Sequence, residues 1–121
     1  MTGLLAARPI YASAALYEPF GLSVLEAASA GCALVLSDIA THRELWAGAA
    51  IFVPARDDAG FASAIQKLIN NPAERAELGE RARQHARRYS SEAMARAMAG
   101  IYARVLSADA CEPREMAGAA A

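Results

Sequence analysis

Three short apolar runs, separated by glycine-containing segments, constrain the fold of this chain more than any other feature. The runs cover residues 10–12, 33–36 and 50–53, and each is continuously apolar and bounded by turn residues. Strands that are covered on both faces have this pattern. Between the first two runs, residues 21–30 form an alanine-rich helical pattern that stops at Gly31. A strand, a helix and a strand in this order form a βαβ unit, whose crossover makes the two strands parallel.

The remaining sequence predicts helices. A short crossover over residues 41–47 leads to the third run, and Asp57 or Asp58 caps a helix whose apolar residues recur at helical spacing. Asn71 and Pro72 start another helix, which runs to about residue 88 and presents a solvated charged face.

A last helix starts at Ser90 or Ser91 and carries an apolar stripe of Met94, Met98, Ile101, Tyr102 and Val105. Residues 107–121 lack periodicity and are expected to form a disordered tail. We therefore expect an α/β fold over residues 1–106, with a short parallel sheet, flanking helices and a helical C-terminus.

Composition narrows the class of protein. The chain has 121 residues and a net charge of -1, which argues against a nucleic-acid binder. Alanine accounts for 32 residues, so the core of this single domain is thin. Cys32 and Cys111 have no neighbouring cysteine or histidine, which disfavours a disulfide framework or a zinc site. The N-terminal apolar run is too short for a signal peptide or a membrane span, so we expect a cytoplasmic protein without a transmembrane segment.

The segment over residues 17–28 carries the candidate chemistry. It lies where the first strand gives way to a helix, and ligands of open parallel sheets bind at this carboxyl end of the strands. Pro19 biases Glu18 toward an extended conformation, so a loop presents Glu18. Gly21 lets the backbone approach a ligand, and the first amides of the helix suit a phosphate or a sugar oxygen. The alternative for Glu18 is a carboxylate that only stabilises the helix N-terminus.

Glu26 stands in a helical segment with no other charged residue. A buried, unpaired carboxylate would cost several kcal/mol, so Glu26 is expected to have a partner from outside its helix. Two adjacent ligand hydroxyls, such as those of a ribose, would suit it. A long-range structural ion pair is the alternative.

The segment from Glu18 to Leu22, followed by Glu26, resembles the E-x7-E motif of the retaining GT-B glycosyltransferases of family 4, also called group 1. The resemblance covers about residues 8–106. Further segments that resemble the family in the same order are residues 31–38, 43–45, 50–54, 78–79 and 89–90. The chain is thus expected to be part of the Rossmann-like C-terminal lobe that binds the donor.

This resemblance implies a hexosyl or glycosyl transferase that moves a sugar from a nucleotide diphosphate sugar, UDP- or GDP-linked, to an acceptor with retention of configuration. It implies that Glu26 binds the ribose hydroxyls and that Glu18, the catalytic residue, contacts donor-sugar hydroxyls near the reacting carbon. The backbone amides of Phe20, Gly21 and Leu22 would face the sugar and the diphosphate. No cofactor and no metal held by the protein are implied.

The sequence also departs from the family pattern. The family has two lobes and a basic pair against the donor diphosphate, and Arg8 is the only basic residue before Glu18. We expect this fragment of a lobe to be inactive alone and to associate with the missing N-terminal lobe or with itself through exposed apolar surface. The alternative functions are an inactive remnant that binds nucleotide sugar or a protein partner, and an unrelated α/β domain.

For the other polar and aromatic residues, the sequence favours a structural role over a functional one. His42 is expected to be a surface polar residue, with a role in the crevice as the alternative, and His85 is expected to face solvent. Asp38 and Glu44 are interpreted as residues that fix loops. Trp46 is interpreted as a packing residue, with base stacking as the alternative.

Overall fold

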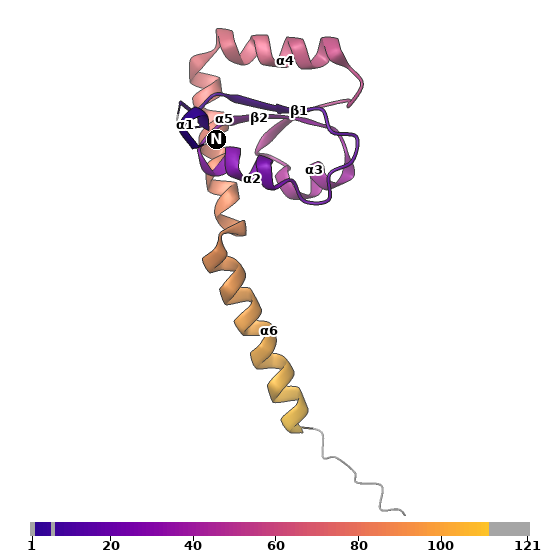
Figure 1. The fold of residues 1–121 in the computed structure, drawn as a ribbon, viewed down its shortest axis with the longest axis vertical. Coiled ribbons are helices and arrows are strands. Elements are labelled where there is room, and N and C mark those ends of the chain that lie inside the picture. Colours follow the sequence, from indigo (N-terminus) through magenta and orange to yellow (C-terminus); the bar gives the residue numbers. More distant parts are fainter. Residues whose placement is uncertain (1, 6, 112–121) are drawn as a thin grey trace, which may run out of the picture. The chain divides into compact units, whose positions relative to one another are not determined.

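Three parallel strands form the centre of the first of two units, Met1–Tyr89 and Ser90–Ala121, into which the chain divides. A computed structural model describes residues 2–5 and 7–111 (Figure 1). The first unit contains, in order, α1 (Thr2–Leu5), β1 (Ile10–Ser13), α2 (Leu22–Ser29), β2 (Ala33–Ser37), α3 (Ala40–Trp46), β3 (Ala50–Val53), α4 (Asp58–Asn70), α5 (Pro72–Ala86) and the 3₁₀ helix η1 (Arg87–Tyr89). The described part of the second unit consists of Ser90 and the helix α6 (Ser91–Cys111).

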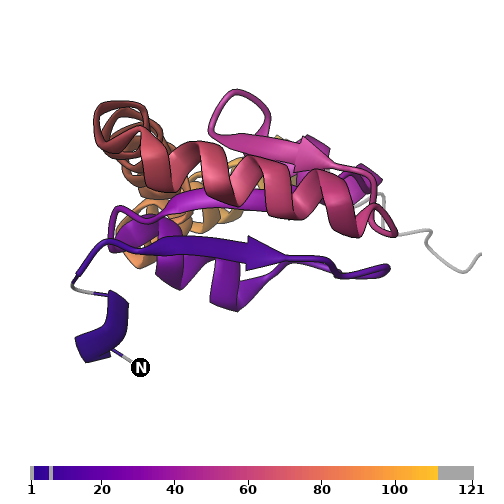
Figure 2. The ribbon, with the colours of Figure 1, turned by 90° about the horizontal axis from the view of Figure 1, so that it is seen from above.

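The sheet has the order β1-β2-β3, and both pairs of neighbouring strands are parallel. Tyr11 of β1 lies opposite Leu34, and Leu36 lies opposite Phe52 of β3. Figure 2 looks onto this sheet from the side of α4. The three apolar runs are therefore the three strands, and the prediction of a parallel α/β fold is confirmed.

The central strand β2 is buried on both faces because its side chains alternate between two apolar clusters. Leu34 and Leu36 pack with α2, α3 and α5 on one face. Ala33 and Val35 pack with α4 and with Leu78 of α5 on the other. Figure 1 shows the same layers, with α4 on one side of the sheet and α2 and α3 on the other. An uninterrupted apolar run, rather than an alternating one, is what such a strand requires.

A close backbone approach joins α5 to the turn before β2. A Cβ atom built at Gly79 would lie 2.2 Å from the carbonyl oxygen of Gly31, so only glycine fits there. Gly31 has a φ of 82°, in the left-handed region that favours glycine. The side chain of Arg8 also lies against this turn, since a Cβ at Gly31 would be 3.5 Å from its Nε. This contact lies at the end of the sheet where the strands begin.

The helix boundaries agree in most places with those expected. Asp57 caps α4, since its carboxylate accepts a hydrogen bond from the Gly60 amide at 2.9 Å. Ser90 precedes α6 and accepts from the Ala93 amide at 3.1 Å. The prediction that a tail starts at residue 107 is wrong for residues 107–111, because α6 continues through Cys111. Residues 112–121, also assigned to the tail, lie outside the described residues.

The apolar stripe of α6 is exposed over its whole length. Its members are Met94, Met98, Ile101, Tyr102 and Val105. Among the described residues, no helix combines the length and the apolar character needed to cross a membrane.

Candidate functional site

The carboxyl ends of the strands are joined by two hydrogen bonds. The Ser37 hydroxyl, at the end of β2, donates to the Ala15 carbonyl in the loop after β1 at 2.6 Å. The Asp38 amide donates to the Val53 carbonyl at the end of β3 at 2.7 Å. The loop over residues 14–21 is thereby held next to the end of β2, at the edge of the sheet where ligands of this class of fold bind.

Glu18 lies in this loop and is half-buried. Its Oε1 accepts a hydrogen bond from the Gly21 amide at 3.0 Å, just before α2. Gly21 has a φ of 80°, and a Cβ there would lie 3.1 Å from Cγ2 of Val24. The arrangement fits the expectation that a loop presents Glu18, and it also places the carboxylate at a helix N-terminus, where a negative charge is stabilised. The Gly21 amide is engaged by Glu18 in this structure.

Glu26 lies one turn into α2, on the face opposite to its buried residues Val24, Ala27 and Ala28. Its side chain is exposed, so the premise that burial forces a partner on it is wrong. None of the ion pairs among the described residues involves Glu26. Leu22, four residues earlier on the same face, is 69% exposed. The carboxylate is therefore open to a ligand.

Phe20 points its ring into the protein. It packs edge-on against Tyr89, with 5.7 Å between ring centroids. Trp46 and His85 complete this aromatic cluster with Tyr89. The first helical hydrogen bond of α2 runs from the Leu25 amide to the Gly21 carbonyl, so the amides of its first turn have no acceptor within the helix. Leu22 supplies the first of these amides.

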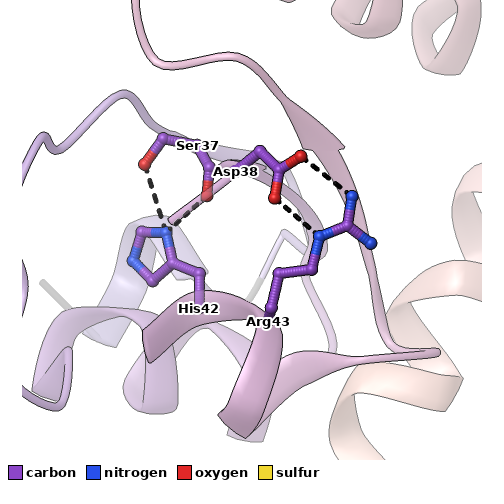
Figure 3. Close-up of polar contacts among 4 residues, drawn as sticks. All are labelled: Ser37, Asp38, His42 and Arg43. Carbon is purple, nitrogen blue, oxygen red and sulfur yellow. Dashed lines mark hydrogen bonds and ion pairs between the residues drawn. The ribbon is translucent and has the colours of Figure 1, made fainter. Parts of the chain in front are cut away.

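The helix α3 carries two polar contacts, which Figure 3 shows together. Arg43 donates from Nε and Nη2 to the two carboxylate oxygens of Asp38, at 2.6 and 2.9 Å. These hydrogen bonds hold the pKa of the Asp38 carboxyl below its ordinary value. The Arg43 guanidinium also lies 4.7 Å from the ring centroid of Phe52. Asp38 therefore fixes a loop, as expected.

The interpretation of His42 as a surface residue is wrong. Its side chain is fully buried, at 0% exposure, and its Nδ1 lies 2.9 Å from the Ser37 carbonyl oxygen. His42 stands four residues before Trp46, which is 1% exposed, so both occupy the buried face of α3. This helical spacing to an aromatic residue is the signal in the sequence that could have identified it.

His85 does not face solvent as expected. It is half-buried, its Nε2 is hydrogen-bonded to the Leu45 carbonyl, and its ring lies 5.5 Å from that of Trp46. Trp46 packs in the core, as interpreted.

Neither cysteine chemistry nor a metal cluster marks this site. Cys32 is a free thiol in the core, and burial raises its pKa. Within residues 2–5 and 7–111, no group of three or more His, Cys, Asp or Glu side chains is arranged to hold a metal ion. The absence of a protein-held metal stays a prediction.

The model of the family of glycosyl transferases group 1 matches residues 3–85. This match contains the whole sheet, the loop that carries Glu18, and the helices α2, α3 and α4. The chain belongs to this family. Its α/β fold is accordingly that of a partial Rossmann-like lobe of a GT-B glycosyltransferase.

The chain is similar in sequence to glycogen synthases and in structure to a sucrose-phosphate synthase. Over 70 residues, the chain is 40% identical to the glycogen synthases of two Mycobacterium tuberculosis strains, CDC 1551 and H37Rv. The match covers 56% of the chain and 17% of each relative, so the chain spans about a sixth of their length. The structure of sucrose-phosphate synthase from Thermosynechococcus elongatus superposes with a TM-score of 0.72 at 28% identity, covering 80% of this chain and 25% of the other.

Proposed function

We propose that this chain supplies part of the nucleotide-sugar donor site of a retaining family 4 glycosyltransferase. Membership of the group 1 family supports the class of reaction. The observation that carries the proposal is the pair of carboxylates at the start of α2. Glu18 is held beside the first turn of α2, in the loop that follows β1, and Glu26 is exposed one turn into the same helix.

Glu18 and Glu26 together form an E-x7-E motif, and the proposal gives each carboxylate a different role. Glu26 accepts hydrogen bonds from the two ribose hydroxyls, which its exposed carboxylate is free to do. Glu18 keeps one oxygen on the Gly21 amide and directs the other at donor-sugar hydroxyls near the reacting carbon. The backbone of Phe20, Gly21 and Leu22 faces the sugar and the diphosphate, while the Gly21 amide stays engaged with Glu18.

The proposed reaction breaks the bond between the anomeric carbon of the sugar and an oxygen of the diphosphate. A bond from that carbon to an acceptor hydroxyl forms on the same face, and the hydroxyl proton passes to the released diphosphate. Negative charge on the leaving group needs cationic stabilisation. Arg8 does not meet this need, since its side chain lies against Gly31, where the strands begin. We therefore propose that residues outside these 121 complete the site and bind the acceptor, and that the chain alone is inactive.

Nucleotide binding tests the proposal. Saturation-transfer NMR with UDP, GDP and ADP at millimolar concentration would compare the parent with Glu26→Gln. We expect a dissociation constant on the order of 1 mM or weaker for the preferred nucleotide, and loss of its signal in Glu26→Gln. Glu77→Gln is the matched control, because it removes an exposed carboxylate on α5 whose ion pair with Arg81 contributes little. Equal signals from the parent and Glu26→Gln for every nucleotide would contradict the proposal.

A second candidate function, as an interaction module, is favoured by the exposed stripe of α6. The exposed fraction of the side chains in this stripe runs from 45% at Ile101 to 61% at Tyr102. A continuous apolar face of this kind marks a surface that associates with protein. We propose that it pairs with another lobe or with a second copy of the chain. We also propose a cytoplasmic localisation for the chain.

A further inference from the structure

Ser37 and His42 are the polar side chains within the buried core of the described residues, and both are at 0% exposure. They lie five positions apart, at the end of β2 and within α3, and Figure 3 shows the ring of His42 directed at Ser37. Burying a polar group is costly unless it is hydrogen-bonded, and an apolar pair would fill the space without that cost. The question is therefore which hydrogen bonds these two side chains make.

The hydrogen bonds around the pair determine where each proton lies. His42 Nδ1 is 2.9 Å from the Ser37 carbonyl oxygen and 3.2 Å from the Ser37 hydroxyl oxygen. A carbonyl only accepts, so Nδ1 carries the proton and donates. The Ser37 hydroxyl donates in turn to the Ala15 carbonyl at 2.6 Å. Nε2 of His42 has no partner among the described residues and, in this tautomer, carries no proton. The result is a directed chain of hydrogen bonds from α3 through β2 to the loop after β1.

This chain ends on the loop that carries Glu18. Ala15 lies three residues before Glu18, and Glu18 itself accepts from the Gly21 amide three residues later. Residues 15–21 are thus held at their start by Ser37 and at their end by the carboxylate of Glu18. If the hydrogen bond between Ser37 and Ala15 were lost, the loop would shift and the Glu18 carboxylate would move with it.

We propose that Ser37 and His42 are positioning residues that set the place of Glu18 at the N-terminus of α2. His42 orients the Ser37 hydroxyl, and that hydroxyl holds the loop through Ala15. The role of this position in sugar transfer rests on the proposed function of Glu18. The claim that Ser37 and His42 set the position of Glu18 is independent of that function. The helix α3 has other attachments, namely the packing of Trp46 and the ion pair of Asp38 with Arg43, so holding α3 does not by itself require the pair.

Hydrogen exchange at the Gly21 amide tests the proposal without any nucleotide, because that amide donates to Glu18. In Ser37→Ala we expect its exchange to accelerate about fivefold, the effect of losing one net hydrogen bond. His42→Leu should have a similar effect. His42→Asn should preserve the parent rate, because its side-chain amide can donate to the Ser37 carbonyl from the position of Nδ1. Ser63→Ala, an exposed substitution on α4, is the control.

Amides of β2, such as that of Val35, report global unfolding in the same samples. Acceleration at Gly21 that exceeds acceleration at Val35 supports the proposal, and equal acceleration at both overturns it, since the pair would then only stabilise the fold. The ring nitrogens of His42 provide a second readout, because a long-range ¹H–¹⁵N spectrum distinguishes the tautomers. A proton on Nε2 instead of Nδ1 would also overturn it. If the parent protein binds no nucleotide, the proposed donor-site function fails. The exchange rates still decide whether Ser37 and His42 position Glu18.

Discussion

Replacement of Gly79 by alanine tests the closest backbone contact in the structure. The new Cβ would lie 2.2 Å from the Gly31 carbonyl oxygen and 3.1 Å from its carbon, both backbone atoms of a turn that cannot rotate away. The helix α5 would have to withdraw from Gly31 to relieve this contact. Ala82, one turn later on the same helix, is fully buried, so this movement would also open the core beside it.

Two effects of opposite sign determine the change in the free energy of unfolding. Overpacking of a filled interior costs about 1–3 kcal/mol, and the upper end applies here because backbone must move. Alanine gains about 1 kcal/mol over glycine in a helix interior. The net effect of Gly79→Ala is destabilisation by about 1–2 kcal/mol, which lowers the Tm of a unit of this size by about 5–15 °C.

The assay is thermal unfolding followed by circular dichroism, with Gly100→Ala as the matched control. Gly100 also lies within a helix, but a Cβ there would meet nothing within 4 Å. The control should therefore keep the helix-propensity gain alone and should not lower the Tm. A Gly79→Ala variant with an unchanged or raised Tm would refute the reasoning, because it would mean that α5 does not approach Gly31 closely.

Two further predictions concern charge and association. Asp38→Asn should lower the urea midpoint at pH 7 and should have no effect in acid. The Asp38 carboxylate has a lowered pKa in the folded state, so it stabilises that state at pH values above its ordinary pKa of 3.8. This contribution is lost as the pH falls through the pKa of the folded state. Equal effects at both pH values would contradict the ion pair with Arg43. Met98→Glu should shift the sedimentation distribution toward smaller species, whereas Ala103→Glu, on the opposite side of α6, should not; equal behaviour of the two variants would argue against association through the stripe.

Local rules were enough to predict the strands and most helix ends. The run at residues 33–36 is apolar throughout because β2 is covered on both faces, which is a property that can be read without a structure. Asp57 and Gly31 act through their own neighbours, as a cap and a left-handed turn. The parallel arrangement then follows from the length of the crossover.

Contacts between elements were not predictable in the same way. The apolar neighbours of Glu26 suggested burial, but the helical period turns it away from Val24 and Ala27. His42 finds its partner at the end of another element, and nothing near it in the sequence indicates Ser37. The extension of α6 has a local cause, since alanine-rich sequence continues a helix even where no apolar stripe remains.

The turn at Gly31 and the loop that carries Glu18 lie at opposite ends of the same three strands. Arg8 and α5 close on the first, and a Cβ at Gly79 would meet the backbone of Gly31 there. The second consists of surface loop, with Tyr17 82% exposed. Under the proposed donor-site function, mutations in this loop alter which ligand binds while the packing at the other end of the strands stays unchanged. Directed evolution of this protein should accordingly accumulate new specificities at one end of the sheet and tolerate almost none at the other.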